Sequence, residues 1–239
     1  MHFIKLLSTI RPMETITRLP TIVKYIGNAR LGYQGALQGE FVEFKSFPEE
    51  ELRKRFGITL TFDESSQQEF LKRITEPLQK VAESTGAELF MAGIDFPLHS
   101  TVLEIKREDA VIPEKEEKMR KIILGENNIR RLPGLTLSFD YMFVDKGGNT
   151  VIAATNIPQV ILSARETVSS DGIREGFSPL PLTNILHISV ARLTKLPDES
   201  NMTQYYKMSG IRPALRFKPL QMTVGSVNAE NTWNFLNRI

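Results

Sequence analysis

Hydrophobic and polar residues alternate most clearly in the part of the chain that follows residue 57. Ile58–Phe62 and Leu135–Asp145 alternate with a period of two, which predicts half-buried strands. Between them, apolar residues recur every three or four positions, at Phe70, Leu71, Ile74, Leu78 and Val81. That spacing predicts an amphipathic helix, capped by Asp63 or Ser65, running to about Ser84 and closed by Gly86.

The same kind of pattern predicts the other elements of the chain. Further strands are expected at Glu88–Ala92, Ser100–Lys106, Thr150–Thr155 and Asn184–Leu193, and further helices at Pro113–Leu124, Pro158–Val168 and Met202–Met208. Lys146–Asn149 has the composition of a hairpin turn, and a last hairpin is expected to pair Phe217–Val224 with Thr232–Leu236 around Asn228–Asn231.

Residues 1–57 give weaker signals. Tyr25–Gly35 contains three glycines and little periodicity, which favours turns, and its glycine spacing does not match a dinucleotide-binding fingerprint. Phe41–Phe44 is expected to be a short strand, and Pro48–Arg55 a short charged helix with Ser46 as its cap. We therefore divide the chain into an N-terminal extension, 1–57, of undefined role, and a two-lobed domain, 58–239.

Strand–helix–strand patterns on both sides of the midpoint favour the α+β class, with mainly antiparallel sheets in two lobes. The composition agrees: 239 residues suit one large domain or two small lobes, and 41% hydrophobic with 24% charged residues is ordinary for a globular protein. A formal net charge of +2 is too small to indicate general nucleic-acid binding. His187–Ile239 is more basic, with seven Lys/Arg against three Asp/Glu, and could favour an anionic substrate.

The absence of cysteine excludes disulfides, thiol catalysis and cysteine-based zinc sites. Met1–Ile10 lacks the long apolar region of a signal peptide, and no segment has 18 uninterrupted apolar residues. We therefore expect a cytoplasmic protein without a membrane partner. The oligomeric state is not determined by the sequence, and a monomer is favoured.

The candidate chemistry lies in two of the three histidines. His99 and His187 are each followed, two positions on, by a hydroxyl residue, Thr101 and Ser189, and each pair falls in a predicted strand. Residues two apart on a strand point to the same face, so adjacent strands would bring two imidazoles and two hydroxyls together. One imidazole can accept a proton from water and the other can donate one, while the hydroxyls bind phosphate oxygens. His2, the third histidine, is expected to be exposed.

The two segments Leu98-His-Ser-Thr-Val-Leu-Glu-Ile and Leu186-His-Ile-Ser-Val-Ala-Arg-Leu resemble the paired motifs of the 2H phosphoesterase superfamily. This superfamily includes 2′,5′ RNA ligase-like proteins and RNA 2′,3′-cyclic phosphodiesterases. The resemblance covers about residues 58–239. It implies a bilobal, pseudo-symmetric fold whose two mainly antiparallel sheets flank a central cleft, with helices on the outside.

The resemblance also implies an activity, which is metal-independent hydrolysis of a cyclic or 2′-linked phosphodiester, such as a nucleoside 2′,3′-cyclic phosphate or an RNA end. No cofactor and no metal ligand are expected. By analogy, His99 would protonate the leaving oxygen and His187 would activate water, with Thr101 and Ser189 binding phosphate. Ser100 is unusually polar for the middle of its motif, which suggests that it faces solvent.

Two further residues are candidates for substrate binding. Arg192 could bind phosphate, although strict alternation puts it on the face opposite His187 unless the strand bulges. Tyr141 could stack on a base, although Phe139, Tyr141 and Phe143 together are more typical of a core stripe. Tyr205-Tyr206 allows the same two interpretations, and Lys207, Arg212, Arg216 and Lys218 could form a basic rim. The charged run at 114–121 predicts a solvent-facing helix.

Two other functions compete with hydrolysis. The first is a non-catalytic module that binds a nucleotide in the same cleft. The second is an interaction scaffold that acts through residues 1–57. Retained full activity in His99→Ala or His187→Ala would exclude the catalytic assignment, whereas stoichiometric nucleotide binding without product would favour the binding module.

Overall fold

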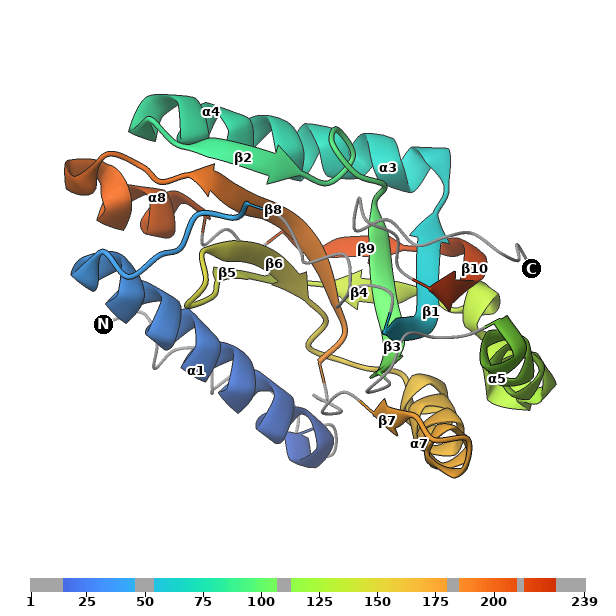
Figure 1. Cartoon of the computed structure of the whole chain (residues 1–239). Coiled ribbons are helices and arrows are strands. Elements are labelled where there is room, and N and C mark those ends of the chain that lie inside the picture. The colour runs from blue at the N-terminus through green and yellow to red at the C-terminus, as the bar shows by residue number, and fades with distance from the viewer. Residues whose placement is uncertain (1–14, 46–53, 107–112, 180–184, 210–212, 227–239) are drawn as a thin grey trace.

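The computed structural model describes residues 15–45, 54–106, 113–179, 185–209 and 213–226 (Figure 1). Among these residues an eight-stranded sheet forms the centre of the molecule, and its main path has the order β10-β1-β3-β8-β6-β5. Every paired neighbour along this path is antiparallel. Helices lie on the outside of the sheet (Figure 1), as the α+β prediction requires.

The first half of the sheet is built on β1 and β3. β1 (Arg55–Phe62) lies between β10 (Pro219–Ser226) and β3 (His99–Lys106), and β7 (Ser178–Pro179) pairs with the far end of β3. The predicted helix from residue 63 to 84 follows β1 as α3 (Glu64–Phe70), the π-helical turn η2 (Leu71–Thr75) and α4 (Glu76–Thr85), and α4 packs against β2 and α8. Asp63 caps its first turn and Gly86 closes it in the left-handed conformation, which confirms both predicted ends.

The second half is built on β8 (His187–Lys195) and repeats this arrangement. β6 (Asn149–Ala153) lies on one side of β8 and is followed by β5 (Tyr141–Val144). On the other side of β8, β3 pairs at the beginning of the strand and β2 (Glu88–Met91) pairs further along. A pair between Ser100 and Ile188 joins the two halves. The predicted division into two mainly antiparallel halves is therefore confirmed, although one pair links them into a continuous sheet.

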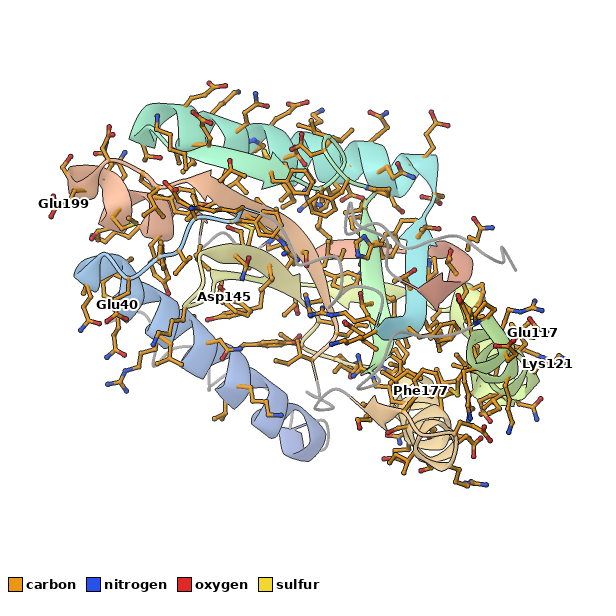
Figure 2. The ribbon with its side chains drawn as sticks, viewed as in Figure 1. Glu40, Glu117, Lys121, Asp145, Phe177 and Glu199 are labelled. Carbon is orange, nitrogen blue, oxygen red and sulfur yellow. The ribbon has the colours of Figure 1, made fainter. Side chains whose placement is uncertain are left out.

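The remaining helices border the two halves. α5 (Pro113–Gly125) packs against β10, and α7 (Gln159–Arg174) packs against β3. α8 (Met202–Ser209) packs against α4 and β5 and is preceded by the short helix η4 (Glu199–Asn201). The short elements α6 (Asn127–Arg130) and η3 (Leu132–Gly134) lie between α5 and β4 along the chain. Figure 2 shows Glu117 and Lys121 of α5 pointing away from the sheet, as expected for the charged run at 114–121.

The prediction of turns at Tyr25–Gly35 is wrong, because this stretch lies within the helix α1 (Thr15–Gln38). Packing against the sheet overrides the low helix propensity of glycine. A Cβ built on Gly32 would lie 1.9 Å from the carbonyl oxygen of Val144, so only glycine lets α1 approach β5 this closely. Tyr25 is also buried at this contact.

The predicted single strand Leu135–Asp145 is divided in two at Asp140. β4 (Leu137–Phe139) pairs with β9 (Leu215–Phe217) in a separate two-stranded sheet, whereas β5 belongs to the central sheet. The Asp140 carboxylate accepts hydrogen bonds from the backbone and the hydroxyl of Thr155, which fixes the chain at this change of sheet.

The last predicted hairpin differs in its first strand. Phe217 ends β9, and the separate strand β10 pairs with β1 along seven positions. Long-range pairing of this kind cannot be found from local turn signals. The expected partner strand Thr232–Leu236 lies outside the described residues.

Of the two short elements predicted before residue 58, one differs and the other lies mostly outside the described residues. Phe41–Phe44 is not a strand, although Phe41 is buried and the backbone N–H of Phe44 donates to the carbonyl of Leu193. Most of the helix expected at Pro48–Arg55 lies outside the described residues, and Arg55 begins β1. Whether 1–57 acts as a separate extension stays a prediction.

Candidate active site

The two predicted histidine motifs meet where the two halves of the sheet join. Ser100 pairs with Ile188, and this antiparallel register, continued by one residue, sets His99 opposite Ser189 and His187 opposite Thr101. All four side chains are half-buried, whereas Ser100 and Ile188 between them are fully buried on the other face. The fold therefore brings together the two imidazoles and two hydroxyls that the sequence placed 88 residues apart.

Ser100 does not face solvent as predicted. It is fully buried, and its hydroxyl donates a hydrogen bond of 2.9 Å to the carbonyl of His187. This bond crosses the junction between the two halves and adds to the single β3–β8 pair. Ser100 thus holds the backbone of one histidine motif against the other.

Both histidine strands bulge at the same place. Val102 is the extra residue of β3 in its pairing with β1, and Val190 is the extra residue of β8 in its pairing with β6. Each bulge lies three residues after its histidine and changes the alternation of the strand. As a result, Glu104 and Arg192 are half-buried on the histidine face. Because β8 bulges, Arg192 does not lie on the face opposite His187 as strict alternation would require.

Each bulge is held by a donor from outside its pairing. The buried guanidinium of Arg165, on α7, donates to the carbonyl of Val102 and to that of Ile185 at 3.0 Å. The carbonyl of Val190 accepts from the backbone of Ala92 at 2.9 Å. Arg165 therefore ties β3 to the segment that leads into His187, a role that the sequence alone did not indicate.

Helix α1 supports the second motif. The Tyr25 hydroxyl donates to the carbonyl of Ala154 at 3.0 Å and lies 3.4 Å from that of Leu186, the residue before His187. Its ring packs against Tyr141, which shares a face with Ala153 and His187 across β5, β6 and β8. The predicted stripe of Phe139, Tyr141 and Phe143 is split, because Phe139 belongs to β4.

A row of phenylalanines on the site face was missed by the sequence reading. Phe96 lies edge-on to His99 at 6.2 Å, Phe90 stacks on Phe96 at 5.1 Å, and Phe44 follows at 6.0 Å from Phe90. The guanidinium of Arg192 lies over the Phe44 ring at 4.7 Å. Phe90 pairs with Arg192 across β2 and β8, so this row fixes the position of the arginine. The strand pattern of Glu88–Ala92 could have indicated Phe90, but Phe44 comes from an irregular segment.

Burial and nearby positive charge keep both imidazoles neutral near pH 7. Burial lowers the pKa of His187 to about 4, helped by the charges of His99, Arg165 and Arg192. Burial also lowers the pKa of His99, while the hydrogen bond between Nδ1 and the carbonyl of Pro97, at 2.8 Å, acts in the opposite direction. Because a carbonyl can only accept, Nδ1 carries a proton and Nε2 is left to react.

These pKa values predict a loss of stability in acid. The unfolded chain protonates its histidines near pH 6.5, whereas His187 in the folded protein protonates only near pH 4. The contribution, at most about 3 kcal/mol, is complete above pH 6.5, declines as the pH falls and is lost below pH 4. Urea unfolding at pH 7 and pH 4.5 should give a smaller free energy at pH 4.5. His187→Asn should reduce this difference, and an unchanged difference would contradict the assigned pKa.

Within the described ranges, no group of three or more His, Asp or Glu side chains is arranged to hold a metal ion. In the same ranges, no helix is long and apolar enough to cross a membrane.

Comparisons with known proteins agree with this architecture. No protein-family model matches the chain, and no curated protein matches it significantly. A crystal structure of a phosphoesterase matches with a TM-score of 0.50 at 14% identity, covering 72% of this chain and 87% of the other. Escherichia coli LigT in its apo form matches with a TM-score of 0.50 at 16% identity and the same coverage. Kluyveromyces marxianus Usb1 with uridine monophosphate gives a lower TM-score, 0.47, at 14% identity over 79% of this chain and 97% of that one.

The chain therefore shares its fold with this phosphoesterase and with Escherichia coli LigT, which agrees with the fold that the two histidine motifs led us to expect. At these identities the likeness concerns the fold. The activity has to be argued from the site itself.

Proposed function

We propose that this protein is a metal-independent phosphodiesterase that hydrolyses a cyclic or 2′-linked phosphodiester, such as a nucleoside 2′,3′-cyclic phosphate or an RNA end. The observation that carries the proposal is the junction of β3 and β8, which sets two His-x-hydroxyl motifs side by side on one face. The supporting comparison is the shared fold with a phosphoesterase. We further propose that the protein is cytoplasmic.

In the proposed reaction, His187 acts as the general base. Its neutral imidazole accepts a proton from water as the water oxygen forms a bond to phosphorus. His99 acts as the general acid in its doubly protonated form: it donates the Nε2 proton to the leaving oxygen as the old phosphorus–oxygen bond breaks, and it keeps the Nδ1 proton that faces the Pro97 carbonyl. The lower pKa of His187 and the carbonyl of Pro97 behind His99 support this division of roles. Proton exchange with solvent then restores both imidazoles.

The other polar residues of the face bind the phosphate in this proposal. Thr101 and Ser189 donate hydrogen bonds to the non-bridging oxygens, where negative charge accumulates. Arg192, held over Phe44, places a guanidinium on the same face, and burial lowers its pKa to only about 10, so it stays charged at pH 7. Tyr141 lies in the same row as His187 and can contact the base of a bound nucleotide.

The first experiment incubates the full chain with EDTA and the four nucleoside 2′,3′-cyclic monophosphates, and separately with an RNA that ends in a cyclic phosphate. Product should form with the wild type and not with the His99→Ala/His187→Ala protein. Chromatography of the product isomer identifies the bond that breaks. Activity that disappears with EDTA and returns with a divalent metal would contradict a metal-independent reaction.

A second candidate function is nucleotide binding without turnover. The lowered pKa of both imidazoles favours this second function, because His99, the proposed acid, is then neutral at pH 7. His99 gains its second proton only when a bound anion raises its pKa. Stoichiometric binding of a mononucleotide, with no product after long incubation and with loss of binding in Arg192→Ala, would support this function instead.

A further inference from the structure

A pocket of about 560 Å³ is lined by residues of α1, β5 and α8. These three elements lie to the left of β3 in Figure 1. Four aromatic rings and two basic side chains contribute to its lining, and they are Tyr33, Tyr141, Phe143, Tyr206, Arg30 and Lys207. The size is in the range of pockets that hold small ligands. Neither histidine motif lines this pocket, and Tyr141 borders both the pocket and the proposed substrate-binding face.

The aromatic rings of the pocket are held in place. Tyr33 and Tyr206 pack at 5.0 Å with their planes tilted by 46°. The Tyr206 hydroxyl donates to the carbonyl of Ala29, which fixes α8 against α1. On the opposite wall, Tyr141 and Phe143 pack at 6.0 Å. The pocket therefore presents fixed aromatic rings on two walls, which suits a flat ligand.

The charge of the pocket is positive. Arg30 and Lys207 are exposed at its edge and come from different helices. Among the described residues that line it, none is acidic. Figure 2 shows Glu40 just beyond the end of α1 and Asp145 at the end of β5, and neither residue lines the pocket. An anionic group at the edge would thus meet two cations, while its apolar part could lie between the rings.

We propose that this pocket binds one nucleotide of a single-stranded RNA, with the base between the aromatic rings and a backbone phosphate at Arg30 and Lys207. Stacking on aromatic rings and a positive edge are the two features that bind single strands without sequence preference. Tyr141 connects the pocket to the site, since it lies two strands from His187, about 10 Å away at ordinary strand spacing. The choice of RNA as the ligand rests on the proposed function, and it makes the substrate an oligonucleotide.

The test measures binding of a short labelled oligouridylate by fluorescence anisotropy, using the His99→Ala/His187→Ala protein so that no turnover interferes. Arg30→Ala/Lys207→Ala should weaken binding and reduce the slope of log Kd against log salt by about 0.7, the value for one phosphate of a single strand. Tyr33→Ala should weaken binding about fivefold or more, whereas Tyr33→Phe should not. Lys24→Ala, which removes an exposed charge of α1 outside the pocket, is the matched control.

RNA binding at the pocket and hydrolysis at the histidine site are measured separately, so either can fail without the other. If no phosphodiester is hydrolysed but the pocket variants bind RNA more weakly, the pocket assignment stands alone. If Arg30→Ala/Lys207→Ala binds as tightly as Lys24→Ala, the pocket is not an RNA site. Loss of binding on removing the charges, without an effect of Tyr33→Ala or with equal competition by inorganic polyphosphate, would overturn the assignment of a stacked nucleotide. Both charged side chains are exposed, so their removal should leave the fold intact.

Discussion

Replacing His187 or His99 with alanine is expected to lower kcat by roughly two to four decades, the usual scale of acid–base catalysis. When both histidines are replaced, the loss of kcat in decades should be smaller than the sum of the two single losses, since the two imidazoles act on the same transition state. Hydrolysis of a nucleoside 2′,3′-cyclic phosphate at pH 6 is the measurement. Arg174→Ala, which changes an exposed residue at the end of α7 outside both histidine motifs, is a suitable control for unspecific loss.

The pH dependence separates the two roles. The base must be neutral, so the acidic limb of kcat/KM should follow His187, whose pKa is about 4. The acid must be protonated, so the basic limb should follow His99 and lie below its ordinary pKa of about 6.5. The optimum is therefore expected on the acidic side of pH 6.5. His187→Ala should remove the acidic limb and His99→Ala the basic limb, and the reverse result would exchange the two roles. Full activity in either single variant would remove the site assignment.

Replacing Gly32 with alanine is expected to destabilise the protein by about 3 kcal/mol, at the upper end of the effects of overpacking. The added Cβ would lie 1.9 Å from the Val144 carbonyl oxygen, and a backbone atom in a paired strand cannot move away easily. For a protein of this size the melting temperature should fall by roughly 6 to 12 °C. Thermal unfolding followed by circular dichroism measures this change.

Gly27 provides the matched control on the same helix. No atom lies within 4 Å of a Cβ built there, so Gly27→Ala should stabilise the protein by about 0.5 to 1 kcal/mol through helix propensity. Gly32→Ala should also lower the rate of hydrolysis, because displacement of α1 withdraws the Tyr25 hydroxyl from the backbone beside His187. Equal stability of the two variants would show that α1 does not pack on β5 as described.

Local signals in the sequence were sufficient for most of the second and third quarters of the chain. The helix beginning at Asp63 is defined by its cap, its apolar spacing and Gly86, and all three depend on neighbours within a few residues. The hairpin around Lys146–Asn149 is similarly local, and β5 and β6 pair as expected. Where the outcome depended on distant partners, as for β4, β9 and β10, the pairing could not be read from the pattern.

The sequence by itself determined the α+β class and the two strands that carry His99-Ser-Thr101 and His187-Ile-Ser189, because alternation and motif spacing are properties of short segments. Only the tertiary structure decided which residues share their face. The bulges at Val102 and Val190 arise from pairing with β1 and β6, and they move Glu104 and Arg192 to the histidine side. The helix α1 and its contact through Gly32 likewise exist only because Val144 lies against it, since packing supplies the stability that a glycine-containing helix lacks.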